Sequence, residues 1–134
     1  MSQALAEAYV PRSGEAIVSI TNRGAPTPSL NDGWAAVLRI AFDDVDPVKS
    51  PVEPGEGLVE LQESEAESIA EFVTGNRDRV TTLIVHCRYG QARSAGVAKA
   101  VAKAYGLHFP KHYRYANNFV YQRVLKALRR LGRA

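Results

Sequence analysis

The sequence TTLIVHCRYGQARSAGVAKAVAKAY occupies residues 81–105 and contains the clearest structural signals in the chain. Residues 81–86 are rich in aliphatic and β-branched side chains, which predicts a strand. Residues 92–105 are mostly small helix formers with lysines on one face, which predicts a helix that ends at Gly106. A strand that passes through a short loop into a helix is typical of an α/β domain.

The rest of the chain carries further strand and helix signals. Residues 16–20 and 35–42 predict two more strands. Ser64 and Glu67 form a capping-box pattern, so a helix is expected to begin at Ser64 and to end near Gly75. A last amphipathic helix is expected over residues 116–131. The length of 134 residues, 46% of them hydrophobic, fits one domain with its own core over residues 1–134.

The loop between the strand and the helix of residues 81–105 combines a thiol with features that bind anions. It reads HCRYGQARS over residues 86–94 and contains Cys87, the only cysteine of the chain. The first amides of a helix lack intrahelical partners and carry the positive end of its dipole. Gly90 allows the backbone to turn successive amides inward. A thiol beside these amides and near Arg93 is expected to have a depressed pKa and to be largely thiolate at neutral pH.

This loop resembles the HCxxGxxRS signature of the cysteine-dependent protein phosphatases. The small dual-specificity branch is the nearest match, because the signature lies late in the chain and an acidic loop precedes it. The resemblance extends from about residue 37 to the end of the chain. It implies a single α/β domain with a central, mostly parallel sheet of four or five strands flanked by helices. It also implies hydrolysis of phosphate monoesters without a metal or another cofactor.

The resemblance assigns a role to each residue of the signature. Cys87 would attack phosphorus and form a phosphocysteine intermediate. Arg93 would hold two phosphoryl oxygens with its planar guanidinium group. His86 would orient the loop and help to keep the thiolate ionised, and Ser94 would hydrogen-bond the departing thiolate. The phosphate-binding positions would be Arg88, Tyr89, Gly90, Gln91, Ala92 and Arg93.

The reaction also needs an acid that protonates the leaving oxygen. In the family an aspartate after an upstream strand does this, in the pattern Leu-x-Ile-x-x-x-Asp, and LRIAFDD over residues 38–44 matches it with Asp44. Asp43 and Asp46 are neighbouring alternatives, because the geometry of a loop after a strand does not follow from periodicity.

The charges of the chain are sorted along its length. Residues 1–71 carry 4 basic and 13 acidic side chains, whereas residues 72–134 carry 13 basic and 1 acidic. An anionic ligand is therefore expected in the second half, although two solvated faces of opposite sign would give the same totals. The basic C-terminal segment has no nucleic-acid-binding motif, and we interpret it as a solvated face rather than a nucleic-acid-binding surface.

The expected partner is a phosphorylated protein or a small phosphate monoester. The single cysteine and the absence of a long apolar segment favour a reducing, cytoplasmic location without a membrane span. Two alternative functions use the same loop. One is a phosphate-binding interaction module without turnover, and the other is thiolate redox or sulfur-transfer chemistry in a rhodanese-like loop.

Overall fold

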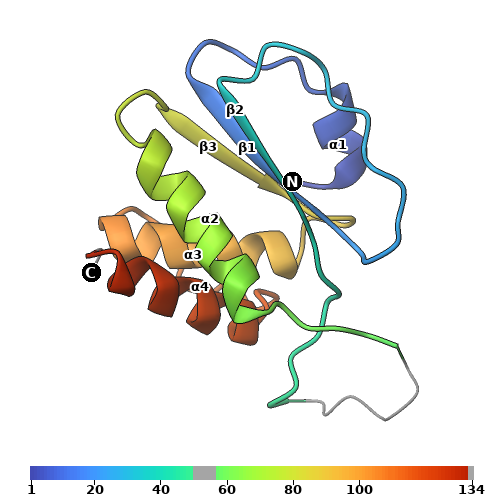
Figure 1. The fold of residues 1–134 in the computed structure, drawn as a ribbon, viewed down its shortest axis with the longest axis vertical. Coiled ribbons are helices and arrows are strands. Elements are labelled where there is room, and N and C mark those ends of the chain that lie inside the picture. The colour runs from blue at the N-terminus through green and yellow to red at the C-terminus, as the bar shows by residue number, and fades with distance from the viewer. Residues whose placement is uncertain (50–56, 133–134) are drawn as a thin grey trace.

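The protein is an α/β domain built on a three-stranded parallel sheet. The computed structural model describes residues 1–49 and 57–132 (Figure 1). The strands are β1 (Glu15–Thr21), β2 (Ala36–Ala41) and β3 (Thr82–His86), in the order β2-β1-β3. All three strands that the sequence predicts are therefore confirmed.

The described ranges contain fewer strands than the four or five that the resemblance implied. Residues 22–35, which join β1 to β2, contain Pro26 and Pro28 and form no strand. A proline cannot donate to a strand ladder, which disfavours pairing there. The N-terminal residues add one isolated bridge, Ser2 to Cys87, and then form a short helix, α1 (Gln3–Ala8), that the sequence did not predict.

The central strand β1 is covered on both faces. Residues 15–20 are all buried, which fits the unbroken apolar run that a central parallel strand requires. Figure 1 shows α2 (Glu63–Asn76), α3 (Arg93–Tyr105) and α4 (Asn118–Arg130) together on one side of the sheet, and α1 on the other side. The main core lies between the sheet and these three helices and includes Ile20, Phe42, Ile69, Val97 and Leu128.

The predicted helices are present, but α2 does not begin where its sequence pattern indicated. The capping interaction involves Gln62 rather than Ser64, because the Gln62 N–H donates to the carboxylate of Glu65 at 2.8 Å. Leu61, fully buried just before this cap, fixes the point at which the chain enters the helix. The expected pairing of Ser64 with Glu67 as a capping box is therefore wrong.

Close packing joins α3 to α4. A Cβ added to Gly96 of α3 would lie only 2.7 Å from the Asn117 carbonyl oxygen, so a residue without a side chain allows this approach. Asn117 caps α4 through its side chain, which accepts a hydrogen bond from the Val120 N–H at 3.1 Å. The start of α4 is thereby placed against the start of α3. Among the described residues, no helix has the length and apolar character needed to cross a membrane.

Candidate active site

The candidate site lies where β3 ends and α3 begins. β3 ends at His86 and α3 starts at Arg93, so residues 87–92 form a short loop at the N-terminus of a 13-residue helix. Gly90 has a φ of 73°, and a Cβ there would lie 2.6 Å from the carbonyl carbon of Met1. Both the left-handed conformation and the close contact therefore require glycine at this position.

The first residues of the chain run beside this loop, a contact that the sequence did not predict. The Cys87 N–H donates to the Met1 carbonyl oxygen at 3.2 Å, and the Gln3 N–H donates to the Arg88 carbonyl oxygen at 3.1 Å. These bonds tie the start of the loop to residues 1–3, whose backbone also lies against Gly90. They restrain the loop in one conformation, as a preorganised anion site needs.

Cys87 is a buried thiol with hydrogen-bond donors around it. Its side chain is 3% exposed, and its Sγ lies 3.2 Å from the Oγ of Ser94. Burial raises the pKa of Cys87 and is the largest single influence, but hydrogen bonds from the Ser94 hydroxyl and from the Ser94 and Gly90 amides, with the charge of Arg93, outweigh it. The net pKa of the thiol is below its ordinary value, which favours the nucleophilic thiolate.

His86 is fully buried and fastens the loop to the central strand. Its Nε2 lies 2.6 Å from Ser19 Oγ on β1, and its Nδ1 lies 3.4 Å from the Cys87 carbonyl oxygen. A carbonyl oxygen only accepts, so Nδ1 carries the proton and Nε2 accepts from the Ser19 hydroxyl. Burial lowers the pKa of His86, which favours the neutral ring. His86 therefore orients the backbone at Cys87 without adding a positive charge.

Arg93 connects the loop to the acidic segment that follows β2. It is 4% exposed, and its Nη1 donates to the Phe42 carbonyl oxygen at 2.8 Å. Phe42 immediately precedes Asp43 and Asp44. One hydrogen bond thus fixes the guanidinium near Cys87 and also places the start of the acidic segment beside the loop.

The two neighbouring aspartates have different environments. Asp43 is 7% exposed, and its carboxylate accepts hydrogen bonds from the backbone N–H groups of Val59 at 2.8 Å and Arg23 at 3.3 Å. Asp44 is exposed, and its Oδ1 accepts from the side-chain amide of Asn117 at 2.9 Å. Asp43 therefore braces the surrounding backbone, whereas Asp44 is accessible. The third alternative, Asp46, accepts from the Val48 and Lys49 N–H groups in a local turn.

Asn117 is a site residue that sequence reasoning missed. Besides Asp44, its side-chain amide donates to the Val45 carbonyl oxygen at 3.0 Å, and its backbone N–H donates to the Ala92 carbonyl oxygen at 3.0 Å. It therefore joins the acidic segment, the Cys87 loop and the start of α4. An asparagine before an amphipathic helix is an N-cap signal, but these long-range contacts leave no local pattern.

The remaining predicted phosphate-binding residues face outward. Arg88, Tyr89 and Gln91 are exposed, and the Arg88 guanidinium lies 5.7 Å from the centre of the Tyr89 ring. A cavity of about 250 Å³ is lined by the acidic segment, including Asp44, by Ala92 of the loop and by residues 114–118, whereas Cys87 and Arg93 are not part of its lining. The predicted acid, Asp44, thus shares a cavity with the last residue of the loop.

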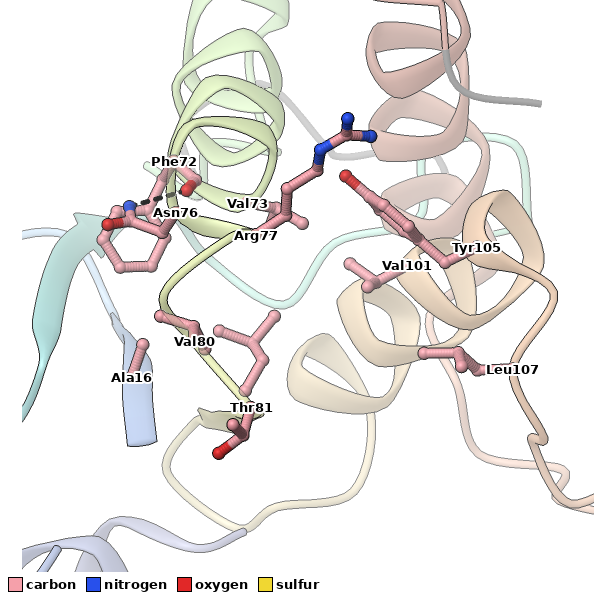
Figure 2. A pocket seen from close by; sticks show the side chains of 11 residues that line it. Ala16, Phe72, Val73, Asn76, Arg77, Val80, Thr81, Val101, Tyr105 and Leu107 are labelled. Carbon is pink, nitrogen blue, oxygen red and sulfur yellow. Dashed lines mark hydrogen bonds between the residues drawn. The ribbon is translucent and has the colours of Figure 1, made fainter. Parts of the chain in front are cut away.

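A second cavity, of about 270 Å³, lies at the opposite end of the sheet. It is lined mainly by apolar side chains, including Phe72, Val80 and Val101 (Figure 2). None of the predicted site residues contributes to its lining, so this cavity is separate from the candidate site around Cys87.

Comparison of the chain with protein-family models and with curated proteins finds no match. Within the described ranges, no group of three or more His, Cys, Asp or Glu side chains is arranged to hold a metal ion.

Removing the Ser94 hydroxyl tests the environment of the thiol. Because this hydroxyl hydrogen-bonds the ionised sulfur, Ser94→Ala should raise the pKa of Cys87. The rate of Cys87 alkylation, measured against pH, should then show its midpoint at higher pH than in the unaltered protein. The matched control is Ser68→Ala on α2, where the hydroxyl donates to the Ser64 carbonyl oxygen. An unchanged midpoint in Ser94→Ala would contradict this description of the site.

Proposed function

We propose that this protein hydrolyses phosphate monoesters through a phosphocysteine intermediate, as a small phosphatase of the dual-specificity type. The observation that carries the proposal is the buried Cys87 with a lowered pKa at the start of α3, next to the buried Arg93. A thiolate and an anion-binding helix N-terminus in one loop serve a reaction in which a nucleophile attacks an anion.

The first step transfers the phosphoryl group to sulfur. The Cys87 thiolate forms the S–P bond while the P–O bond to the leaving group breaks. Arg93 and the loop amides hold the non-bridging oxygens as charge shifts among them. Asp44, protonated, gives its proton to the leaving oxygen, which departs as an alcohol or phenol.

The second step releases the phosphate. Asp44, now a carboxylate, accepts a proton from water as that water attacks phosphorus, and the S–P bond breaks. The sulfur leaves as a thiolate, which the Ser94 hydroxyl stabilises from its position 3.2 Å away. Asp44 is then protonated again and Cys87 is again a thiolate, and inorganic phosphate leaves the loop.

The roles of the supporting residues follow from their contacts. Asn117 acts as a positioning residue for Asp44, because its amide holds one carboxylate oxygen at 2.9 Å. His86 and Ser19 act as positioning residues for the backbone at Cys87. A thiolate nucleophile works only while it stays reduced, so we place the activity in the cytoplasm. The proposed substrates are phosphorylated proteins or small phosphate monoesters.

Replacement of the nucleophile tests the proposal. Cys87→Ser should lower turnover of an aryl phosphate by at least about 10³-fold, because an alkoxide is much harder to form than a thiolate. The variant should still bind inorganic phosphate in an equilibrium titration, since the amides and Arg93 remain, and vanadate should inhibit the unaltered protein.

Two results would contradict the proposal. Turnover by Cys87→Ser at the rate of the unaltered protein would show that the reaction does not pass through a phosphocysteine intermediate. Phosphate binding by the unaltered protein without any turnover would instead identify an interaction module.

Replacement of the acid tests the second part of the mechanism. Asp44→Asn should lower the turnover rate by roughly 10²–10⁴-fold, because the leaving oxygen then departs without a proton. An acid works only when protonated, so the unaltered rate should fall as pH rises, and this fall should disappear in Asp44→Asn. The neighbouring carboxylate provides the control, since Asp46→Asn should keep the fall. Disappearance of the fall in Asp43→Asn, with its retention in Asp44→Asn, would transfer the role to Asp43.

A further inference from the structure

A third cavity is lined by residues of α3, of the segment that follows it and of α4. It has a volume of about 210 Å³ and lies between the C-terminal half of α3, the segment 107–113 and α4. Three lysines and three aromatic side chains contribute to its lining: Lys99, Lys103, Lys111, Phe109, Tyr113 and Tyr121.

The positive charge of this cavity is not neutralised by the described part of the chain. Among the described residues, none of the three lysines that line the cavity forms an ion pair. In contrast, Lys126 and Arg130 of α4 pair with Glu63 and Glu67 of α2. The Lys99 ammonium lies 4.5 Å from the centre of the Tyr121 ring, a cation–π contact that leaves its charge in place. Uncompensated ammonium groups around one concave space favour an anionic ligand.

One residue that lines the cavity forms a hydrogen bond with the Cys87 loop. The Tyr113 hydroxyl donates to the Gln91 carbonyl oxygen at 2.5 Å, so one wall of the cavity contacts the loop directly. Edge-to-face contacts of the Tyr113 ring with Phe109 and Tyr115 hold this wall in place. Lys99 and Lys103 lie one and a half to three helical turns beyond Arg93, or about 9 and 15 Å along α3.

These separations, measured along the helix axis, set the scale for a peptide that would extend from the Cys87 loop to the cavity. A strand advances about 3.3 Å per residue, so about 9–15 Å corresponds to three to five residues. The volume of about 210 Å³ is below the roughly 300–1,000 Å³ of sites for whole small molecules, which fits a single side chain better than a cofactor.

We propose that this cavity, which we call the lysine subsite (Lys99, Lys103 and Lys111), binds an anionic side chain located three to five residues from the phosphorylated residue of a peptide substrate. The anionic group is a carboxylate or a second phosphate, which share the chemistry that the ammonium groups recognise. The inference rests on the proposed phosphatase function and names its substrate class as phosphopeptides with acidic flanks.

The test compares matched phosphopeptides in the intact protein. The peptides carry Glu, phosphoserine or Gln at a position three to five residues from the phosphotyrosine. Recognition is measured as the kcat/KM of the Glu or phosphoserine peptide divided by the kcat/KM of the Gln peptide. The triple variant Lys99→Gln, Lys103→Gln, Lys111→Gln should lower this ratio about tenfold, because each exposed ion pair contributes a small amount. The ratio should also fall with added salt.

The control removes the same charge from another surface. Lys126→Gln, Arg129→Gln, Arg130→Gln changes three basic residues of α4, two of which pair with α2, and should leave the ratio unchanged. A ratio near one in the unaltered protein would overturn the lysine subsite. An equal fall in both triple variants would overturn it too, since net charge alone would then explain recognition.

A binding measurement separates failure of the subsite from failure of the proposed function. Unphosphorylated fluorescent peptides with Glu or Gln are titrated with the protein, and anisotropy reports binding without turnover. Absence of aryl phosphate turnover in the unaltered protein would count against the phosphatase function. Tighter binding of the Glu peptide, lost in the lysine variant, would still support the lysine subsite, and equal binding of both peptides would overturn it.

Discussion

The proposed chemistry depends on stabilising a negatively charged sulfur in a buried position. Burial alone opposes ionisation of Cys87, and the protein offsets this with the Ser94 hydroxyl, the amides of Gly90 and Ser94 and the Arg93 charge. These groups act together only because β3 delivers Cys87 to the N-terminus of α3. The parallel sheet and the packing of α3 therefore place the thiol among groups that lower its pKa, at a helix N-terminus of the kind that favours anions.

The loop is held from several directions by long-range hydrogen bonds. Ser19 of the central strand fixes His86, Met1 bonds the backbone at Cys87, and the Phe42 carbonyl oxygen holds Arg93. Asn117 adds a connection from α4 to both Ala92 and Asp44. Because each contact comes from a different element, the geometry of the loop depends on the whole domain. Such preorganisation is what lets fixed donors stabilise charge during a reaction without rearranging.

Local sequence patterns predicted the parts of the fold that depend on neighbouring residues. The three strands and the helices α3 and α4 follow from apolar periodicity and from the residues that end them. The proximity of Cys87 to Arg93 and Ser94 was predictable because the three residues lie close together in the sequence, whereas their roles remain a proposal. The start of α2 was missed, because two capping patterns compete and the burial of Leu61 selects the one at Gln62.

Contacts between distant segments could not be predicted from the sequence. The different environments of Asp43 and Asp44 arise from Val59 and Asn117, which lie 16 and 73 residues away along the chain. The number of strands depends on whether the prolines in the connection between β1 and β2 prevent strand pairing there. The helix α1 has only six residues, which is too short to give a clear periodic signal. The charge asymmetry follows from the sequence alone, but the gathering of three lysines around one cavity depends on how α3, α4 and the segment between them pack.

The proposed mechanism requires that Cys87 becomes covalently phosphorylated during turnover. The most direct measurement is to stop the unaltered protein with denaturant during hydrolysis of an aryl phosphate and to determine its intact mass and the modified residue. We expect a species heavier by one phosphoryl group, with the phosphate on Cys87. Turnover with no phosphorylated protein, or with the phosphate on another residue, would contradict it.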